Sequence, residues 1–252
     1  MTTTIKQEVF KLAKQQLIMK QSLALTLLII GMALVTKFGN FELLTAENLV
    51  PTLFNSSWLI VFSMVYLASQ IFSMEFRFGT IKNMLQKDGS RSKIFFSKFL
   101  LLIGYSLYLN FLAMILTVAV SLILFPEVSL EQSAIWQTLL TTVGAGFVGM
   151  WLFASLSLMI SLIVQNESLA GMLGLISYFM SSMLAGVQFL VLDQAAWLKW
   201  DPFNMLNLAN QLADSSLSQM TLLSTGQLII GNFVYIALFI LIAKVVFQRR
   251  KI

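Results

Sequence analysis

Six long runs of residues without a charged side chain divide this chain, and they constrain its fold more than any other feature. A helix needs about 20 mostly apolar residues to cross the hydrocarbon core of a bilayer. Five runs exceed that length; the first is shorter, but the lysines that flank it, Lys20 and Lys37, can extend their charged ends to the membrane surface. The runs cover residues 21–36, 48–74, 99–126, 132–166, 168–192 and 215–243. The sequence therefore predicts an all-α membrane protein that forms one domain, residues 1–252, with six transmembrane helices. The expected spans are residues 17–37, 56–74, 99–125, 135–164, 168–192 and 224–247, each to within a few residues.

The positions of the basic residues predict the orientation of these spans. Of the 16 Lys and Arg residues, 14 lie on one side of the predicted spans: up to the start of the first span, in loops on that side, or from the end of the last span onward. Only Lys37 and Lys199 lie on the other side. Because cytoplasmic segments carry an excess of Lys and Arg, both termini are expected in the cytoplasm. The net charge of +5 is then a signal of membrane orientation and not of a nucleic-acid partner.

Composition excludes several kinds of chemistry. The chain has no His and no Cys, so imidazole bases, thiolate nucleophiles and the usual zinc sites are ruled out. No segment reads GxxxxGK[ST], the P-loop that cradles a nucleotide. We therefore expect no catalytic residue, no metal and no cofactor on this chain, and any work driven by ATP must use a partner.

The segment before the first span has the pattern of an amphipathic helix, at about residues 4–16. One face of that helix carries Ile5, Val9 and Leu12, and the other carries Lys11 and Lys14. This pattern predicts a helix that lies in the membrane interface. The alternative is a simple extension of the first span into water.

The loop after the second span, residues 75–98, combines charge with an apolar stripe. It holds six cations and two anions in 24 residues, yet Ile81, Met84 and Leu85 follow helical spacing. A short amphipathic helix is expected there, followed by a turn at residues 88–90. A solvated loop is the alternative, and it explains the charge but not the stripe.

This loop resembles the corresponding loop of type-2 ABC exporter permeases, the class of antibiotic, lantibiotic-immunity and polysaccharide exporters. The resemblance extends to the chain length, the six spans and the N-terminal helix. The shared pattern is E-x3-G-T-I-x3-L-x4-S-R-x6-K, although Gly89 stands where the family usually has Pro. The resemblance implies a coupling helix at about Thr80–Gln86 that docks on an ATP-binding subunit. The implied coupling residues are Glu75, Gly79, Thr80, Ile81, Met84, Leu85, Ser90, Arg91 and Lys98. Glu75 and Arg91 are expected to fix the two ends of the loop, as an ion pair.

Two other segments are candidates for function. Glu167, in the tight turn between the fourth and fifth spans, is either a second cytoplasmic contact or a helix cap. Residues 193–225 are too apolar for a solvated loop and too charged for a span, which predicts short helices half inserted in the outer leaflet. The resemblance implies that they cap the translocation path; the alternative is an aromatic belt without a gating role. The candidate outer-gate residues are Trp197, Trp200, Pro202 and Phe203.

Small residues in the fourth and fifth spans predict close packing between helices. They are Gly144, Ala145, Gly146 and Gly149 in the fourth span, and Ala170, Gly174, Ser177, Ser181 and Ala185 in the fifth.

The resemblance implies a permease subunit of an exporter in a bacterial plasma membrane. Two permease subunits, identical or related, would work with two cytoplasmic ATPases that bind ATP and Mg. No span centre carries a charge, which disfavours an ion-driven carrier and suits an amphipathic substrate such as an antimicrobial peptide or a hydrophobic drug. Two other classes remain open: a membrane scaffold or sensor without transport, and an ATP-independent channel or carrier.

Overall fold

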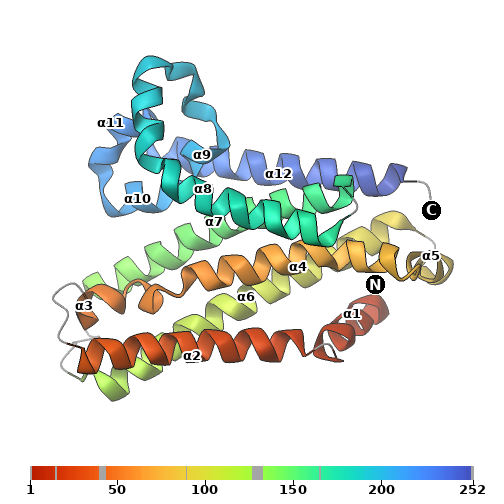
Figure 1. Cartoon of the computed structure of the whole chain (residues 1–252), viewed down its shortest axis with the longest axis horizontal. Helices are drawn as coiled ribbons and strands as arrows, with labels where there is room; N and C mark the ends of the chain where they lie inside the picture. Colours follow the sequence, from red (N-terminus) through yellow and green to blue (C-terminus); the bar gives the residue numbers. More distant parts are fainter. Residues whose placement is uncertain are drawn as a thin grey trace. The chain divides into compact units, whose positions relative to one another are not determined.

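The computed structural model describes residues 2–14, 16–39, 44–88, 90–126, 133–164 and 166–250, and every regular element in these ranges is a helix (Figure 1). Five of the helices are long and apolar enough to cross a membrane. They are α2 (Leu17–Phe38), α4 (Ser57–Arg77), α6 (Arg91–Leu124), α7 (Ser133–Val164) from Ile135 onward, and α12 (Thr225–Arg249). The protein is therefore an all-α membrane protein.

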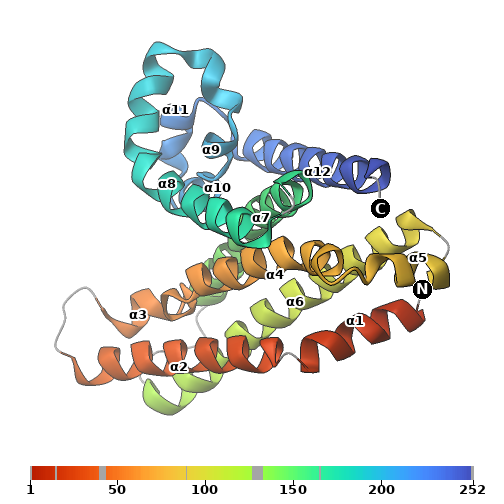
Figure 2. The same ribbon diagram turned by 45° about the vertical axis from the view of Figure 1, so that its right-hand side comes forward.

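The fifth predicted span falls within α8 (Glu167–Gln194). The apolar stretch recognised in that helix, Ser168–Ser181, is too short to count among the candidate spans. The α8 ribbon also changes direction partway along its length (Figure 2). A span at residues 168–192, and with it the total of six, thus remains a prediction.

Short helices connect the long ones. They are α1 (Thr2–Lys14), α3 (Ala46–Leu49), η1 (Leu53–Asn55), α5 (Ile81–Asp88), η2 (Ala196–Trp200), α9 (Pro202–Met205), α10 (Leu208–Ala213), η3 (Ser215–Leu217) and α11 (Ser218–Thr221), where η marks a 3-10 helix.

The chain forms two compact units, neither of them continuous in sequence. The first combines Met1–Ser63 with Phe99–Gly144, and the second combines Met64–Lys98 with Ala145–Ile252. The helices α4, α6 and α7 each contribute residues to both units.

In the first unit, α1 is a separate helix from α2 because the backbone between them leaves helical geometry. Gln16, at the start of α2, is left-handed with φ of 54°. Within α1, Glu8 and Leu12 are buried, whereas Val9 and Phe10 are exposed. The expected amphipathic helix at residues 4–16 is therefore present as α1, while its position in a membrane interface remains a prediction.

In the second unit, α4, α7 and α8 pack closely through small residues. A Cβ added at Gly174 of α8 would lie 2.6 Å from Val65 Cγ1 on α4 and 3.1 Å from Ser157 Cβ on α7. The hydroxyl of Ser157 donates to the Val65 carbonyl at 3.2 Å. The close packing expected at Gly174 is thus confirmed. At Gly146 and Gly149 of this unit, and at Gly144 of the first unit, an added Cβ would meet nothing within 4 Å, so these glycines mark no close approach among the described residues.

This contrast predicts opposite effects for the same substitution. Gly174→Ala is expected to lower stability by about 1–3 kcal/mol, because Val65 is stiff and the site is already filled. Gly146→Ala is the matched control and is expected to be neutral or to stabilise by up to ~1 kcal/mol, because Ala favours a helix over Gly. Thermal unfolding of both variants in detergent measures the difference, and equal shifts would contradict the packing described here.

Candidate functional site

The chain passes from α4 to α5 through a tight turn at residues 78–80. Gly79 has φ of +66°, a left-handed conformation that favours glycine. The amide of Phe78 still bonds to the Met74 carbonyl at 2.9 Å, and the Met84 amide bonds to the Thr80 carbonyl at 3.1 Å. The predicted short helix at about Thr80–Gln86 is therefore confirmed as α5, which begins at Ile81 and ends at Asp88.

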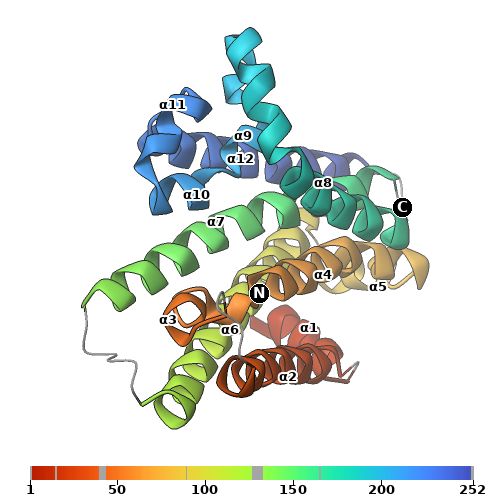
Figure 3. The same ribbon diagram turned by 60° about the vertical axis from the view of Figure 1, so that its left-hand side comes forward.

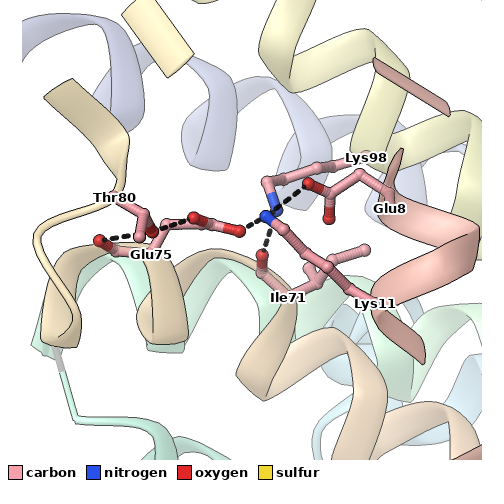
Figure 4. A network of polar contacts seen from close by, with 6 residues as sticks. All are labelled: Glu8, Lys11, Ile71, Glu75, Thr80 and Lys98. Carbon is pink, nitrogen blue, oxygen red and sulfur yellow. Dashed lines mark hydrogen bonds and ion pairs between the residues drawn. The ribbon is translucent and has the colours of Figure 1, made fainter. Parts of the chain in front are cut away.

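A buried ion pair supports this turn (Figure 4). Lys98, on α6, is fully buried, and its Nζ donates to Glu75 Oε1 at 3.1 Å and to the Ile71 carbonyl at 2.8 Å. The hydroxyl of Thr80 donates to the other carboxylate oxygen of Glu75. Burial of two charges is costly unless further hydrogen bonds satisfy them, and here both partners have such bonds. The pair joins the end of α4, the start of α5 and the first turns of α6.

Arg91 does not pair with Glu75, so that expected ion pair is wrong. Its guanidinium Nη1 donates to the carbonyl oxygens of Gln248 at 2.6 Å and of Arg250 at 2.5 Å. The last carbonyls of a helix have no partner within the helix, and the C-terminal end of its dipole favours a cation. Arg91 therefore caps the C-terminus of α12. The amide of Gln248 also donates to Ser92 Oγ at 2.8 Å.

An aromatic cluster lies at the same end of the second unit. The Phe247 ring on α12 is 5.0 Å from that of Phe72, and 6.1 Å from those of Phe76 and Phe95. Phe72, Phe95 and Phe247 are fully buried, and the Arg250 guanidinium lies 3.4 Å from the Phe76 ring centre. The sequence reasoning missed this cluster, although Phe72 and Phe76 share one face of a helix end.

The side chains of α5 divide into a buried set and an outward set. Ile81 is 3% exposed and faces the interior of the chain, whereas Met84 and Leu85 are half-buried. Phe78 is 59% exposed, and the Arg77 guanidinium lies 4.7 Å from its ring centre. Of the three expected anchors, only Met84 and Leu85 are thus open to a partner, and Phe78 joins them as a residue that the sequence reasoning missed.

The other residues of the loop lie at its edges. Ser90 directly precedes α6, where its carbonyl accepts from the Ile94 amide at 3.3 Å. Lys82 and Gln86 are exposed on α5. Gly89 and the side chain of Asp88 lie outside the described part of the chain.

The turn before α8 contains a helix cap, but the residue that caps is Asn166. Its side-chain oxygen accepts from the Leu169 amide at 3.1 Å. Glu167 begins α8, and its side chain lies outside the described part of the structure. The proposed second contact at Glu167 therefore stays a prediction.

Residues 196–221 form a cap of short helices, η2 to α11, beside the first half of α12 (Figures 1 and 3). The predicted short helices are confirmed, and their insertion into a leaflet remains a prediction. Trp197 is 78% exposed, Trp200 44% and Phe203 41%, while Pro202 is half-buried. These candidate gate residues therefore lie on the outside of the cap.

The interior of the cap is held by carboxamide side chains that the sequence reasoning missed. Asn204 Nδ2 donates to the carbonyls of Lys199 at 2.7 Å and Thr221 at 2.9 Å. Gln211 Nε2 donates to the Leu223 carbonyl at 2.9 Å. Asn204 and Gln211 are almost fully buried, so these bonds fix the cap as a folded body.

Among the described residues, no group of three or more His, Cys, Asp and Glu side chains is placed to hold a metal ion. Packing, helix capping and the buried ion pair of Glu75 and Lys98 therefore define the described site, and its exposed surface is suited to contact with another molecule.

These features define a membrane protein with an amphipathic helix fixed between two long apolar helices. The model of one family, described as a protein of unknown function (DUF2705), matches residues 11–252, and the chain belongs to that family. No curated protein matches the sequence.

Proposed function

We propose that this chain is the membrane-spanning subunit of an ATP-driven exporter and that α5 is its coupling helix. The observation that carries this proposal is the buried pair of Glu75 and Lys98 beneath the start of α5. A loop that only connects two spans gains nothing from a fully buried charge pair, whose desolvation is costly. A helix that must receive force from a partner does need a rigid base.

The outward surface of α5 and of the turn before it fits a partner with an apolar groove and an acidic rim. Phe78, Met84 and Leu85 supply apolar anchors, and Arg77 and Lys82 supply positive charge around them. In protein interfaces a few buried anchors dominate the affinity, while charges on the rim orient the partners. Glu167, at the start of α8, is proposed as a second contact with the same partner.

The partner is an ATP-binding subunit, and ATP and Mg bind there, because this chain has no P-loop. Two permease subunits, identical or related, and two ATPases would form the complex. Alternation between two states of such a complex moves the substrate. No span carries a charge near its centre, and we therefore propose an amphipathic substrate. An antimicrobial peptide or a hydrophobic drug is our best candidate.

This proposal places both termini and α5 on the cytoplasmic side of a bacterial plasma membrane, and the cap of short helices outside. The distribution of Lys and Arg supports that orientation. Because the chain has no Cys, single cysteines can be introduced without removing any native thiol. In intact cells, a membrane-impermeant thiol reagent is expected to label Trp197→Cys and to leave Lys82→Cys unlabelled until the membrane is opened. Labelling of Lys82→Cys in intact cells would refute the orientation.

A cross-link between α5 and the ATPase tests the function itself. The partner to be tested is any ATP-binding protein whose gene lies next to the gene for this chain. With a short thiol-to-amine cross-linker, Met84→Cys is expected to join the two proteins. Ile176→Cys is the control, since Ile176 is 47% exposed but lies in the apolar stretch of α8. Absence of a cross-link from Met84→Cys, or equal cross-linking from both positions, would count against the proposal. A channel or carrier that works without ATP needs no such contact, whereas a scaffold or sensor would form it without moving a substrate.

A further inference from the structure

The helix α12 is attached at both ends by directional bonds that lie within the second unit. At its C-terminal end, Arg91 binds the carbonyls of Gln248 and Arg250, and Phe247 fills the aromatic cluster. These contacts come from α4 and α6, the helices that flank α5. The C-terminal end of α12 is thus fixed to the base of the α5 turn.

The first half of α12 is attached to the cap with equal specificity. Asn232 is fully buried, and its Nδ2 donates to the Met205 carbonyl at 2.7 Å. A Cβ added at the neighbouring Gly231 would overlap Met205 Sδ, so the glycine permits this close approach. The hydroxyl of Tyr235 donates to the Trp200 carbonyl at 2.6 Å.

The two attachments are far apart on one continuous helix. Asn232 and Gln248 are 16 residues apart within Thr225–Arg249, which corresponds to about 24 Å at 1.5 Å per residue. We propose that α12 is a connecting rod, which passes a displacement of the α4–α5–α6 junction to the cap of short helices. The source of that displacement, a partner pulling on α5, rests on the proposed function; the mechanical link does not.

The element α8 is a weaker candidate for this role, although it runs directly into the cap. Its ribbon changes direction partway along its length (Figure 2), so a push at one end can be absorbed in the bend. The α12 ribbon is drawn as one uninterrupted helix in the same view. Among the described elements, α12 therefore offers the more direct connection.

A rod makes the two attachments thermodynamically coupled, and coupling between two sites is reciprocal. Loosening the Arg91 cap must loosen the contacts at Asn232, and the reverse must hold by the same factor. If α12 instead tolerates independent movement of its ends, each substitution will have only local consequences.

Hydrogen–deuterium exchange of the purified chain in lipid nanodiscs distinguishes these cases. In Arg91→Gln, amide exchange is expected to increase about tenfold both in the last turns of α12 and in residues 202–213 of the cap. Lys93→Gln, two residues along the same helix, removes a cation without removing the α12 cap and is expected to leave both regions unchanged. An increase confined to the last turns of α12 would overturn the proposal.

Substitution at the other end provides the reciprocal test. Asn232→Leu is expected to increase exchange at the cap and also in residues 91–95, at the start of α6. In a double-mutant cycle, two substitutions this far apart normally have additive effects on the free energy of unfolding. The rod is supported if the change in exchange rate in the double variant Arg91→Gln with Asn232→Leu differs by threefold or more from the product of the two single changes. Effects that simply combine contradict it. If Arg91→Gln does not fold, Ser92→Ala is used in its place, because this change removes the bond with Gln248 and keeps the Arg91 cap. The conservative variant Arg91→Lys is expected to retain most of the protection from exchange.

A further experiment uses the complex with the ATPase. A spin label on Trp197→Cys in the cap is expected to change its mobility on addition of ATP. Asn232→Leu, at the other attachment of α12, is expected to abolish that change while the ATPase stays bound. A response that persists in Asn232→Leu would overturn the rod. If no ATPase binds the unsubstituted chain, the proposed function fails, and the exchange measurements still decide whether α12 links its two ends.

Discussion

Replacement of Lys98 by Met is expected to destabilise the protein by about 3–5 kcal/mol. The side chain keeps its approximate length, but the ammonium that donates to Glu75 and to the Ile71 carbonyl is lost. Glu75 is 5% exposed, so its carboxylate would remain buried after the Lys98 ammonium, its counter-ion, is gone. A buried charge without its counter-ion is among the most destabilising changes in a folded chain. Thermal and denaturant unfolding in detergent measure the loss.

Two controls separate the ion pair from a general effect of charge. Lys93→Met removes an exposed cation on the same helix and is expected to change stability by less than about 0.5 kcal/mol. The double variant Glu75→Leu with Lys98→Met is expected to recover most of the loss, because an apolar pair can replace a buried ion pair at little cost. Similar losses for Lys98→Met and Lys93→Met would show that the pair contributes little.

Leu85→Asp is expected to weaken binding of the ATPase about 30-fold or more, the effect of losing an anchor worth ~2 kcal/mol. Leu85 is half-buried on the outward side of α5, so a charge there meets the apolar groove proposed on the partner. Insertion into the membrane is expected to be unchanged, because α5 is separate from the candidate spans. Affinity of the detergent-purified subunits, measured by titration, gives the fold-change.

The neighbouring Gln86 supplies the matched control for that experiment. Gln86 is exposed, and Gln86→Asp introduces the same charge one residue further along α5. A small effect is expected there, since the residue does not belong to the apolar stripe. Full association and transport by Leu85→Asp would show that α5 is only a solvated connector.

The long helices were the most predictable part of the structure, because exclusion of charge from the hydrocarbon core is a local property of the sequence. The predicted span at residues 17–37 corresponds to α2, and that at residues 224–247 to α12. The predicted span at residues 99–125 is shorter than α6, which begins at Arg91. Lys98 lies in the additional turns at the start of that helix, inside the protein, where Glu75 compensates its charge.

The partners of the site residues could not be predicted in the same way. The motif named Glu75, Arg91 and Lys98, but their partners depend on how α4, α6 and α12 pack. Arg91 binds carbonyls more than 150 residues away in sequence, and no local pattern records that contact. The burial of Ile81 could not be predicted either. Helical spacing places this residue on the apolar stripe, but packing against the rest of the chain buries it.

The proposed function is tested most directly by ATP hydrolysis of the purified components in lipid nanodiscs. The chain alone, the ATP-binding protein encoded by an adjacent gene alone, and the two together would be compared under the same conditions. We expect no hydrolysis by the chain, a stable complex with two ATPases, and a change in the rate of hydrolysis when the complex forms. Hydrolysis by the chain alone that survives controls for contamination, or failure of the two proteins to associate, would contradict the proposed function.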